Sequence, residues 1–268
     1  MTRALIGGGI LSVILATAVL AAVWTPYDPL HAVPAERLIA FSAEHPLGTD
    51  RFGRDILSRL MTGSQITLLV GTVAVALSAG IGTALGVVAG MRGGWPATVI
   101  LRGSDILLAF PALLLAIVAG AVFGPSTLSA MIAIGIAGVP GFARVARAGT
   151  LGVMRQDYIA AARISGLSPV TIALRHVLPN ISGVLIVQST VAFALAVLAE
   201  AALSFLGLGT PAPEPSWGRM LYSAQASLGT HWHLAVWPGA AIAVTVLGAN
   251  LLGDGLRDLL DPHRRQRA

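Results

Sequence analysis

The chain has 268 residues, of which 55% are hydrophobic and only 11% are charged, a composition typical of a protein whose solvent is lipid. All 17 basic residues are arginine, and there is no cysteine, which excludes a lysine-containing phosphate loop, a Schiff-base nucleophile, disulfides and thiolate metal sites. The net charge of +5 comes from arginines scattered between apolar stretches, so we expect no nucleic-acid partner.

Six apolar stretches are long enough to cross a membrane as helices. The first, 4–24, has 21 uncharged residues, enough at about 1.5 Å per residue to cross a hydrocarbon core of about 30 Å. A signal peptide is its alternative interpretation, but the apolar run continues past the candidate cleavage site at 16–18. The other five are expected at 65–89, 106–123, 127–145, 181–205 and 234–252. Residues 1–268 are therefore predicted to form one all-α, polytopic membrane helix bundle of six transmembrane helices.

The unequal distribution of arginine between the loops orients these spans. With the N-terminus in the cytoplasm, 12 of the 17 arginines lie inside, so both termini are expected to be cytoplasmic. Residues 25–64 then form an external loop and 253–268 a cytoplasmic C-terminal tail. Within the external loop, Ile56, Leu57, Leu60 and Met61 share one helical face, which predicts an interfacial helix along the outer membrane surface.

Glycine recurs every four residues on one face of the second span, at Gly82, Gly86 and Gly90. Such a face lets two helix backbones approach closely in a membrane. The run 80–86 also resembles a dinucleotide-binding fingerprint, but no strand precedes it. We therefore expect helix packing at this face.

Glu200 is the one acidic residue expected inside a span. A carboxylate in lipid is costly, so it should face protein or water, and two interpretations stay open. It is a candidate translocation or gating residue, or it makes a structural hydrogen bond to a neighbouring helix.

Two other polar groups have simpler explanations. His231 and His233 offer two imidazoles, which would make a partial metal site at most, and interfacial polar residues are the commoner explanation. Asp254, Asp258 and Asp261 recur at helical spacing around Arg257. They suggest a solvated, charge-paired terminal helix rather than a catalytic carboxylate pair.

The cytoplasmic loop 146–180 is longer than a plain connection, and its residues specify two short helices. Ala160, Ala161 and Ala162 favour a first helix, and Gly166 can take the left-handed conformation that ends it. Ser168 should cap a second helix with Pro169 in its first turn, and Pro179 should end that helix before the fifth span. Two angled helices would form a compact projection that fits a groove in another protein.

This loop resembles the signature loop of bacterial ABC importer permeases, which reads E-A-A, three residues, G, nine residues, I-x-L-P. Ala161, Ala162, Gly166, Leu178 and Pro179 match it, while Ala160 and His176 stand where the acidic residue and the isoleucine are usual. The stretches 45–60, 199–209 and 253–262 are similar to the dipeptide, oligopeptide and nickel permease group, second-subunit type. The resemblance therefore extends over nearly the whole chain.

The resemblance implies a type I ABC importer permease fold and a multi-pass subunit of the bacterial plasma (inner) membrane. It implies four partners besides lipid: a second permease in a heterodimer, two ATPase subunits and an extracytoplasmic solute-binding protein. No cofactor is expected in this chain, since ATP and Mg²⁺ would be bound by the ATPase subunits. Docking of those subunits is expected at Ala160, Ala161, Ala162, Arg163, Gly166, Leu178 and Pro179.

The expected mechanism is alternating access, driven by ATP binding to the partner subunits and passed on through the loop. Di- or oligopeptides are the first expectation for the solute, with nickel second and other small solutes third. Two alternatives remain, a membrane enzyme that uses Glu200 or the terminal aspartates and a stand-alone channel. The first lacks a convergent acid, base and nucleophile, and the second leaves the two-helix loop without a role.

Overall fold

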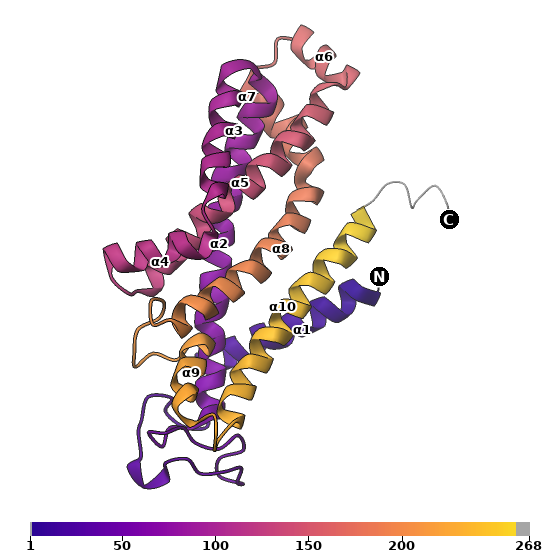
Figure 1. Ribbon diagram of the computed structural model, residues 1–268. Coiled ribbons are helices and arrows are strands. Elements are labelled where there is room, and N and C mark those ends of the chain that lie inside the picture. The colour runs from indigo at the N-terminus through magenta and orange to yellow at the C-terminus, as the bar shows by residue number, and fades with distance from the viewer. Residues whose placement is uncertain (1, 261–268) are drawn as a thin grey trace.

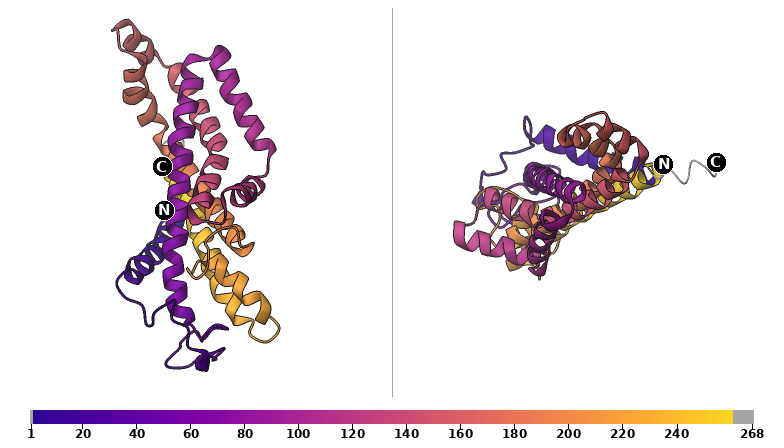
Figure 2. Two further views of the ribbon diagram at one scale, coloured as in Figure 1. Left: turned by 90° about the vertical axis from the view of Figure 1, so that its left-hand side faces the viewer. Right: turned by 90° about the horizontal axis from the view of Figure 1, so that it is seen from above.

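The computed structural model describes residues 2–260, which form an elongated helical bundle without a β-strand in that range (Figure 1). Five helices in it are long and apolar enough to cross a membrane. They are α1 (Thr2–Ala21), α2 (Ile56–Arg92), α5 (Thr127–Met154), α8 (Leu178–Phe205, continuous with residues from Pro169) and α10 (His233–Leu260). Helix α2 runs along most of the length of the molecule (Figure 2).

The sixth apolar stretch is broken. Helices α3 (Gly94–Ala109) and α4 (Ala112–Phe123) meet at an angle of 80° and make a sixth span only if the bent pair is counted as one. The span expected at 106–123 is therefore interrupted, because Pro111 donates no hydrogen bond and restricts the residue before it. Phe110 is accordingly extended, with φ −95° and ψ 129°.

Short elements cover the two ends of the bundle. The 22–55 loop with η1 (Pro34–Glu36), α9 (Trp217–Ala224) and η3 (Gln225–Ser227) lies at one end. Helix α6 (Asp157–Ile164), α7 (Pro169–Ile172) and the π turn η2 (Ala173–Val177) lie at the other end (Figure 1). The arrangement separates the loops expected outside from the loop expected inside.

The glycine face of α2 packs against α5, which confirms the prediction of a close helix contact. A Cβ added at Gly82 would meet Val139 O and Phe142 Cβ, and one added at Gly86 would meet the carbonyl of Ala143. A Cβ at Gly90 would likewise lie 2.6 Å from Thr150 Cβ. Only residues without side chains allow the two backbones to come this close.

The end of α10 packs inside the bundle. A Cβ at Gly255 would collide with Ala4 of α1, and one at Gly253 would collide with the Thr190 hydroxyl. The part of the expected C-terminal tail that the structure describes, residues 253–260, is the continuation of α10. Asp254 and Arg257 are exposed on this helix, whereas Asp261 lies outside the described residues.

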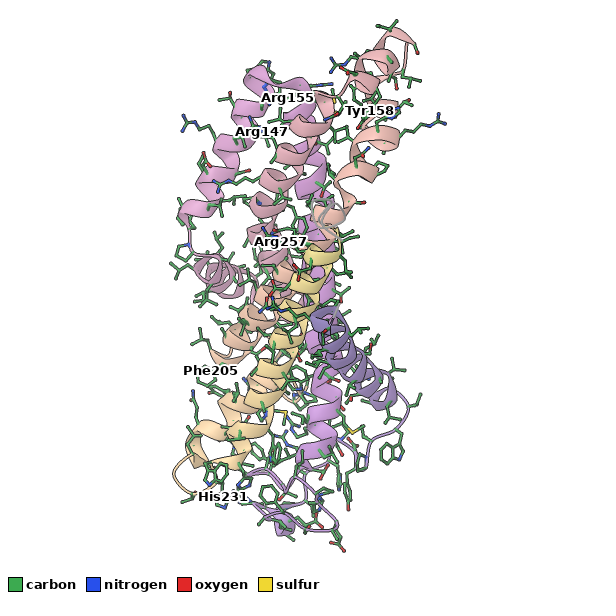
Figure 3. The ribbon with its side chains drawn as sticks, turned by 90° about the vertical axis from the view of Figure 1, so that its right-hand side faces the viewer. Arg147, Arg155, Tyr158, Phe205, His231 and Arg257 are labelled. Atoms are coloured by element: carbon green, nitrogen blue, oxygen red, sulfur yellow. The ribbon has the colours of Figure 1, made fainter. Side chains whose placement is uncertain are left out.

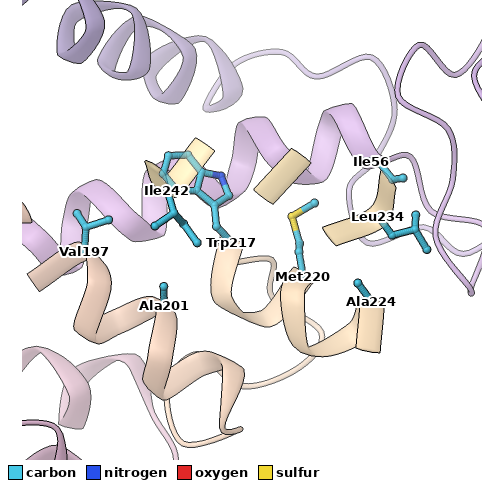
Figure 4. Close-up of a cluster of buried hydrophobic side chains, with 8 residues drawn as sticks. All are labelled: Ile56, Val197, Ala201, Trp217, Met220, Ala224, Leu234 and Ile242. Carbon is cyan, nitrogen blue, oxygen red and sulfur yellow. The ribbon is translucent and has the colours of Figure 1, made fainter. Parts of the chain in front are cut away.

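A cluster of buried apolar side chains holds the opposite end together (Figure 4). Trp217 of α9 is its largest member, belongs to the same cluster as Ile56 and Val197, and donates from Nε1 to the carbonyl of Leu60 at 2.9 Å. The separate interfacial helix expected in the external loop is instead the start of α2. Asp55 caps it by accepting from Ser58 N at 2.7 Å, and Ile56 and Met61 are buried against protein.

Candidate functional site

The first short helix of the 146–180 loop ends at Gly166, as its sequence predicts. Gly166 has φ +75°, and no atom lies within 4 Å of the place a Cβ would take. Its N–H donates to the carbonyl of Arg163, and Leu167 N–H donates to that of Ala162. This pair of bonds is a Schellman motif, which needs a left-handed residue at the Gly166 position.

The second short helix begins as predicted but does not end as predicted. Ser168 caps α7 by accepting from Thr171 N at 3.2 Å, and Pro169 occupies its first turn. Pro179 was expected to end the helix, but α7 continues through η2 into α8. In the π turn, Leu178 N–H bonds the carbonyl five residues back, at Ala173. Because the regular ladder is already interrupted there, a residue without an N–H is accommodated.

We call residues 157–177 the knob. Its inner side is fixed to the bundle, because Ile159, Ile172 and Val177 are buried in one cluster with Val87 of α2 and Ala146 of α5. The knob is therefore positioned by the ends of the long helices.

The outer side of the knob presents apolar side chains to the surroundings. Ile164 is 88% exposed, Val170 67% and Leu174 59%. Exposed apolar side chains gathered on one projecting segment are typical of a protein–protein contact. Tyr158, near the same end as Arg147 and Arg155, is also largely exposed (Figure 3).

The residues expected to dock a partner occupy both sides of the knob and the start of α8. Ala160, Ala161, Arg163 and Pro179 are exposed, Leu178 is half-buried and Ala162 is buried. Ala162 packs in the same cluster as Leu167. It therefore stabilises the helix end, whereas its exposed neighbours remain available for a contact.

Glu200 lies near the other end of α8 and is 1% exposed. Its Oε1 accepts from Ser204 Oγ at 2.7 Å, and Ser204 Oγ in turn accepts from Thr210 N at 3.0 Å. Through Ser204 the carboxylate thus holds the chain that follows α8. Its second oxygen, Oε2, is buried without a hydrogen-bond partner, which is a costly arrangement for a polar group.

In an importer of the kind that the sequence resembles, we expect Glu200→Ala to reduce solute uptake more than it reduces the amount of chain in the membrane. Alanine removes both the Ser204 acceptor and the unpaired oxygen, whereas glutamine can still accept from Ser204. Uptake per molecule should therefore be measured for Glu200→Ala and Glu200→Gln, with membrane abundance measured by immunoblot. Uptake per molecule equal to that of the parent chain in both variants would make Glu200 structural.

A cavity of about 300 Å³ lies between α2, α5 and α8 and is lined mainly by small and apolar residues. Gln188 of α8 and Ser78 of α2 supply the polar side chains on its wall. Ser78 Oγ donates to carbonyls of its own helix and of α5, at Ala74 and Gly135, whereas Gln188 Nε2 lies 3.3 Å from the place that a Cβ of Gly141 would take. Glu200 is not among the lining residues.

Sequence reasoning missed Gln188. The available signal was an uncharged polar side chain in the middle of an apolar span, where polar groups usually face protein or water. Only charged residues inside the spans were considered as candidates, and Glu200 was the one that this criterion found.

The two histidines that could offer a partial metal site lie at the opposite end of the molecule. The rings of His231 and His233 lie 5.9 Å apart, and His231 Nδ1 is 2.8 Å from the Thr230 hydroxyl (Figure 3 labels His231). Within residues 2–260, no group of three or more metal-binding side chains converges.

Comparison with known proteins identifies the class of this fold. Residues 82–266 match the family described as binding-protein-dependent transport system inner membrane component. The chain belongs to this family and is a permease subunit of an ABC importer, of the dipeptide/oligopeptide group. The family is a membrane component of transport systems and is not itself catalytic, so the membrane-enzyme alternative is withdrawn.

Curated relatives extend over almost the whole chain. The dipeptide transport system permease protein DppC of Alkalihalophilus pseudofirmus is 42% identical over 97% of this chain and 85% of its own length. The di/tripeptide transport system permease protein DppC of Pseudomonas aeruginosa is 40% identical over 98% and 89%. The glutathione transport system permease protein GsiD of Escherichia coli is 44% identical over 88% and 76%.

A solved structure agrees in fold. The MetNI methionine ABC transporter in an inward-facing conformation has a chain that superposes with a TM-score of 0.62 at 19% identity. The match covers 75% of this chain and 96% of that chain. The type I permease architecture expected from the sequence is therefore supported by structure as well as by family.

Proposed function

We propose that this chain is one of two permeases in a heterodimer that imports di- or oligopeptides. Two partner ATPases would supply the energy and bind ATP and Mg²⁺, and an extracytoplasmic binding protein would deliver the solute. Peptide as solute is supported by the relatives whose names specify dipeptide, di/tripeptide or glutathione transport. Nickel remains the second candidate and other small solutes the third.

The observation that carries the coupling part of the proposal is the two-sided knob. Its inner residues are buried against α2 and α5, while Ile164, Val170 and Leu174 are exposed at its tip. A partner bound to the tip of the knob would therefore move α2 and α5 through the buried contacts of the knob with these helices. The partner would contact Ala160, Ala161 and Arg163 together with the exposed side chains of Ile164, Val170 and Leu174.

The proposed route for the solute follows the cavity lined by Ser78 and Gln188. No charged side chain lines it, so a zwitterionic peptide would pass without a fixed charge to bind tightly. Such a wall suits transport of peptides with varied side chains. The choice between solutes would then depend mainly on the extracytoplasmic binding protein. The second permease would supply the facing wall.

Co-purification and uptake test this proposal together. The tagged chain, expressed with its neighbouring transport genes, should bring down a second permease and ATPase subunits, and proteoliposomes containing them should hydrolyse ATP and take up labelled dipeptide. The chain purified alone should hydrolyse no ATP, because it lacks the lysine of a phosphate loop. Robust hydrolysis by the isolated chain, or uptake of nickel but not of peptide, would contradict it.

We predict that both ends of the chain face the cytoplasm. The prediction rests on the arginine bias, and the structure places the start of α1 beside the end of α10, with Gly255 packed on Ala4. Reporter fusions after residue 268 and within the 210–216 loop should give cytoplasmic and external signals, respectively. An external signal from the C-terminal fusion would overturn this topology.

A further inference from the structure

A pocket at the end of the bundle expected outside is lined by four arginines. It has a volume of about 230 Å³ and lies between the 25–55 loop, the start of α2 and α9. Its cationic lining comprises Arg51, Arg54, Arg59 and Arg219. The loop and α9 lie at the same end of the molecule in Figure 1. The peptide-import function proposed above assigns no role to these arginines.

The positive charge of this pocket is only partly neutralised. Asp50 pairs with Arg54 at 2.7 Å and lies 3.7 Å from Arg59, and Glu214 is near enough to attract Arg59. Within residues 2–260, Arg51 and Arg219 form no ion pair. Two guanidinium groups are therefore left without a carboxylate.

Arg51 carries the clearest sign of a missing partner. Its Nε is buried and has no hydrogen-bond acceptor. A buried charged donor without an acceptor is costly, because it loses its water and gains nothing in return. An incoming carboxylate oxygen would satisfy it, and guanidinium groups bind carboxylates in a bidentate manner.

The rim of the pocket has the composition of a protein–protein contact. Phe52 is 44% exposed, and the guanidinium carbons of Arg51 and Arg54 each lie 4.7 Å from its ring centroid. The guanidinium carbon of Arg219 likewise lies 4.9 Å from the ring centroid of Tyr222. Exposed aromatic rings with arginines are enriched in interfaces and among the residues that dominate binding energy.

We propose that this arginine pocket receives an acidic side chain of the extracytoplasmic solute-binding protein. The inference rests on the Proposed function, which requires such a partner, and the family description itself specifies dependence on a binding protein. The occupant is a protein carboxylate, because the excess charge is positive and the exposed Phe52 and Tyr222 add apolar contact area. Docking should consequently be strongest at low ionic strength.

The test measures docking of the purified binding protein to the complete importer in lipid nanodiscs, at low and high salt. Arg51→Gln and Arg219→Gln are chosen because neither side chain forms an ion pair within residues 2–260. Each should weaken docking about tenfold at low salt, and the double variant should show a smaller dependence on salt. Arg102→Gln, an exposed arginine of α3, is the matched control and should dock normally.

Two comparisons separate this proposal from the function on which it rests. A parent importer that neither docks the binding protein nor takes up peptide would contradict the Proposed function itself. A parent that does both, with unchanged docking by the double variant, would overturn the pocket alone. Two further results would contradict the pocket proposal. One is a variant that docks the binding protein normally but changes the uptake of peptides relative to peptide amides. The other is a docking defect that appears only in nanodiscs containing anionic lipid.

Discussion

Gly166→Trp is expected to reduce solute uptake by at least tenfold while the chain remains inserted and stable in the membrane. Any side chain at φ +75° adds strain of about 1 kcal/mol or more. The site is otherwise open, since no atom lies within 4 Å of the added Cβ. The indole would therefore project from the bend of the knob, where a docked partner has to fit. Membrane abundance, ATPase co-purification and uptake measure the outcome.

Smaller substitutions at the same position separate bulk from backbone strain. Asparagine tolerates the left-handed conformation, so Gly166→Asn should keep the helix end and most of the uptake. Gly166→Ala should give an intermediate result because it adds strain but little bulk. Full uptake and normal ATPase association by the tryptophan variant would show that the knob is only a connection between spans.

Gly86→Val is expected to lower the amount of folded chain several-fold and to reduce its heat stability in detergent. The added Cβ would collide with the Ala143 carbonyl of α5 and lie 2.7 Å from Ala146 Cβ. Backbone atoms cannot move aside, so α2 and α5 must separate. Overpacking of this kind costs about 1–3 kcal/mol, and loss of the close contact adds to it. Size-exclusion profiles after a series of heating steps would measure the loss.

Gly80→Val is the matched control for this prediction. Gly80 lies on the same helix, and no atom is within 4 Å of its added Cβ. The substitution changes helix propensity in the same direction but contacts no neighbouring helix. Equal heat stability of the two variants would show that the glycine face of α2 does not hold the bundle together.

Features encoded by a few adjacent residues could be predicted from sequence. Gly166 and Ser168 sit where a left-handed residue and a helix cap are needed, and both interactions involve neighbours within five residues. The glycine face at 82–90 was readable because its period of four needs no knowledge of the partner helix. Family membership followed from motifs that extend along most of the chain.

Features set by long-range packing were missed or misplaced. Ile56 and Met61 have the spacing of an interfacial helix, but both are buried in the folded chain, and Ile56 belongs to the same cluster as Trp217 of α9. The packing of residues 253–255 depends on α1 and α8, which are distant in sequence. At Pro179, a general rule for helix ends was overridden by a π turn that no local pattern indicated. Gln188 gains its significance only from the cavity that it lines.

The uninterrupted run from Pro169 to Phe205 makes α7, η2 and α8 a single lever. At about 1.5 Å per residue, its 37 residues span roughly 55 Å. A tilt of about 5° at the knob would move the far end by about 5 Å, more than the length of a hydrogen bond. That far end holds Glu200, whose bond to Ser204 secures the chain leading to α9. Under the proposed coupling, a movement of the knob would therefore reach the Glu200–Ser204 contact at the other end of the helix.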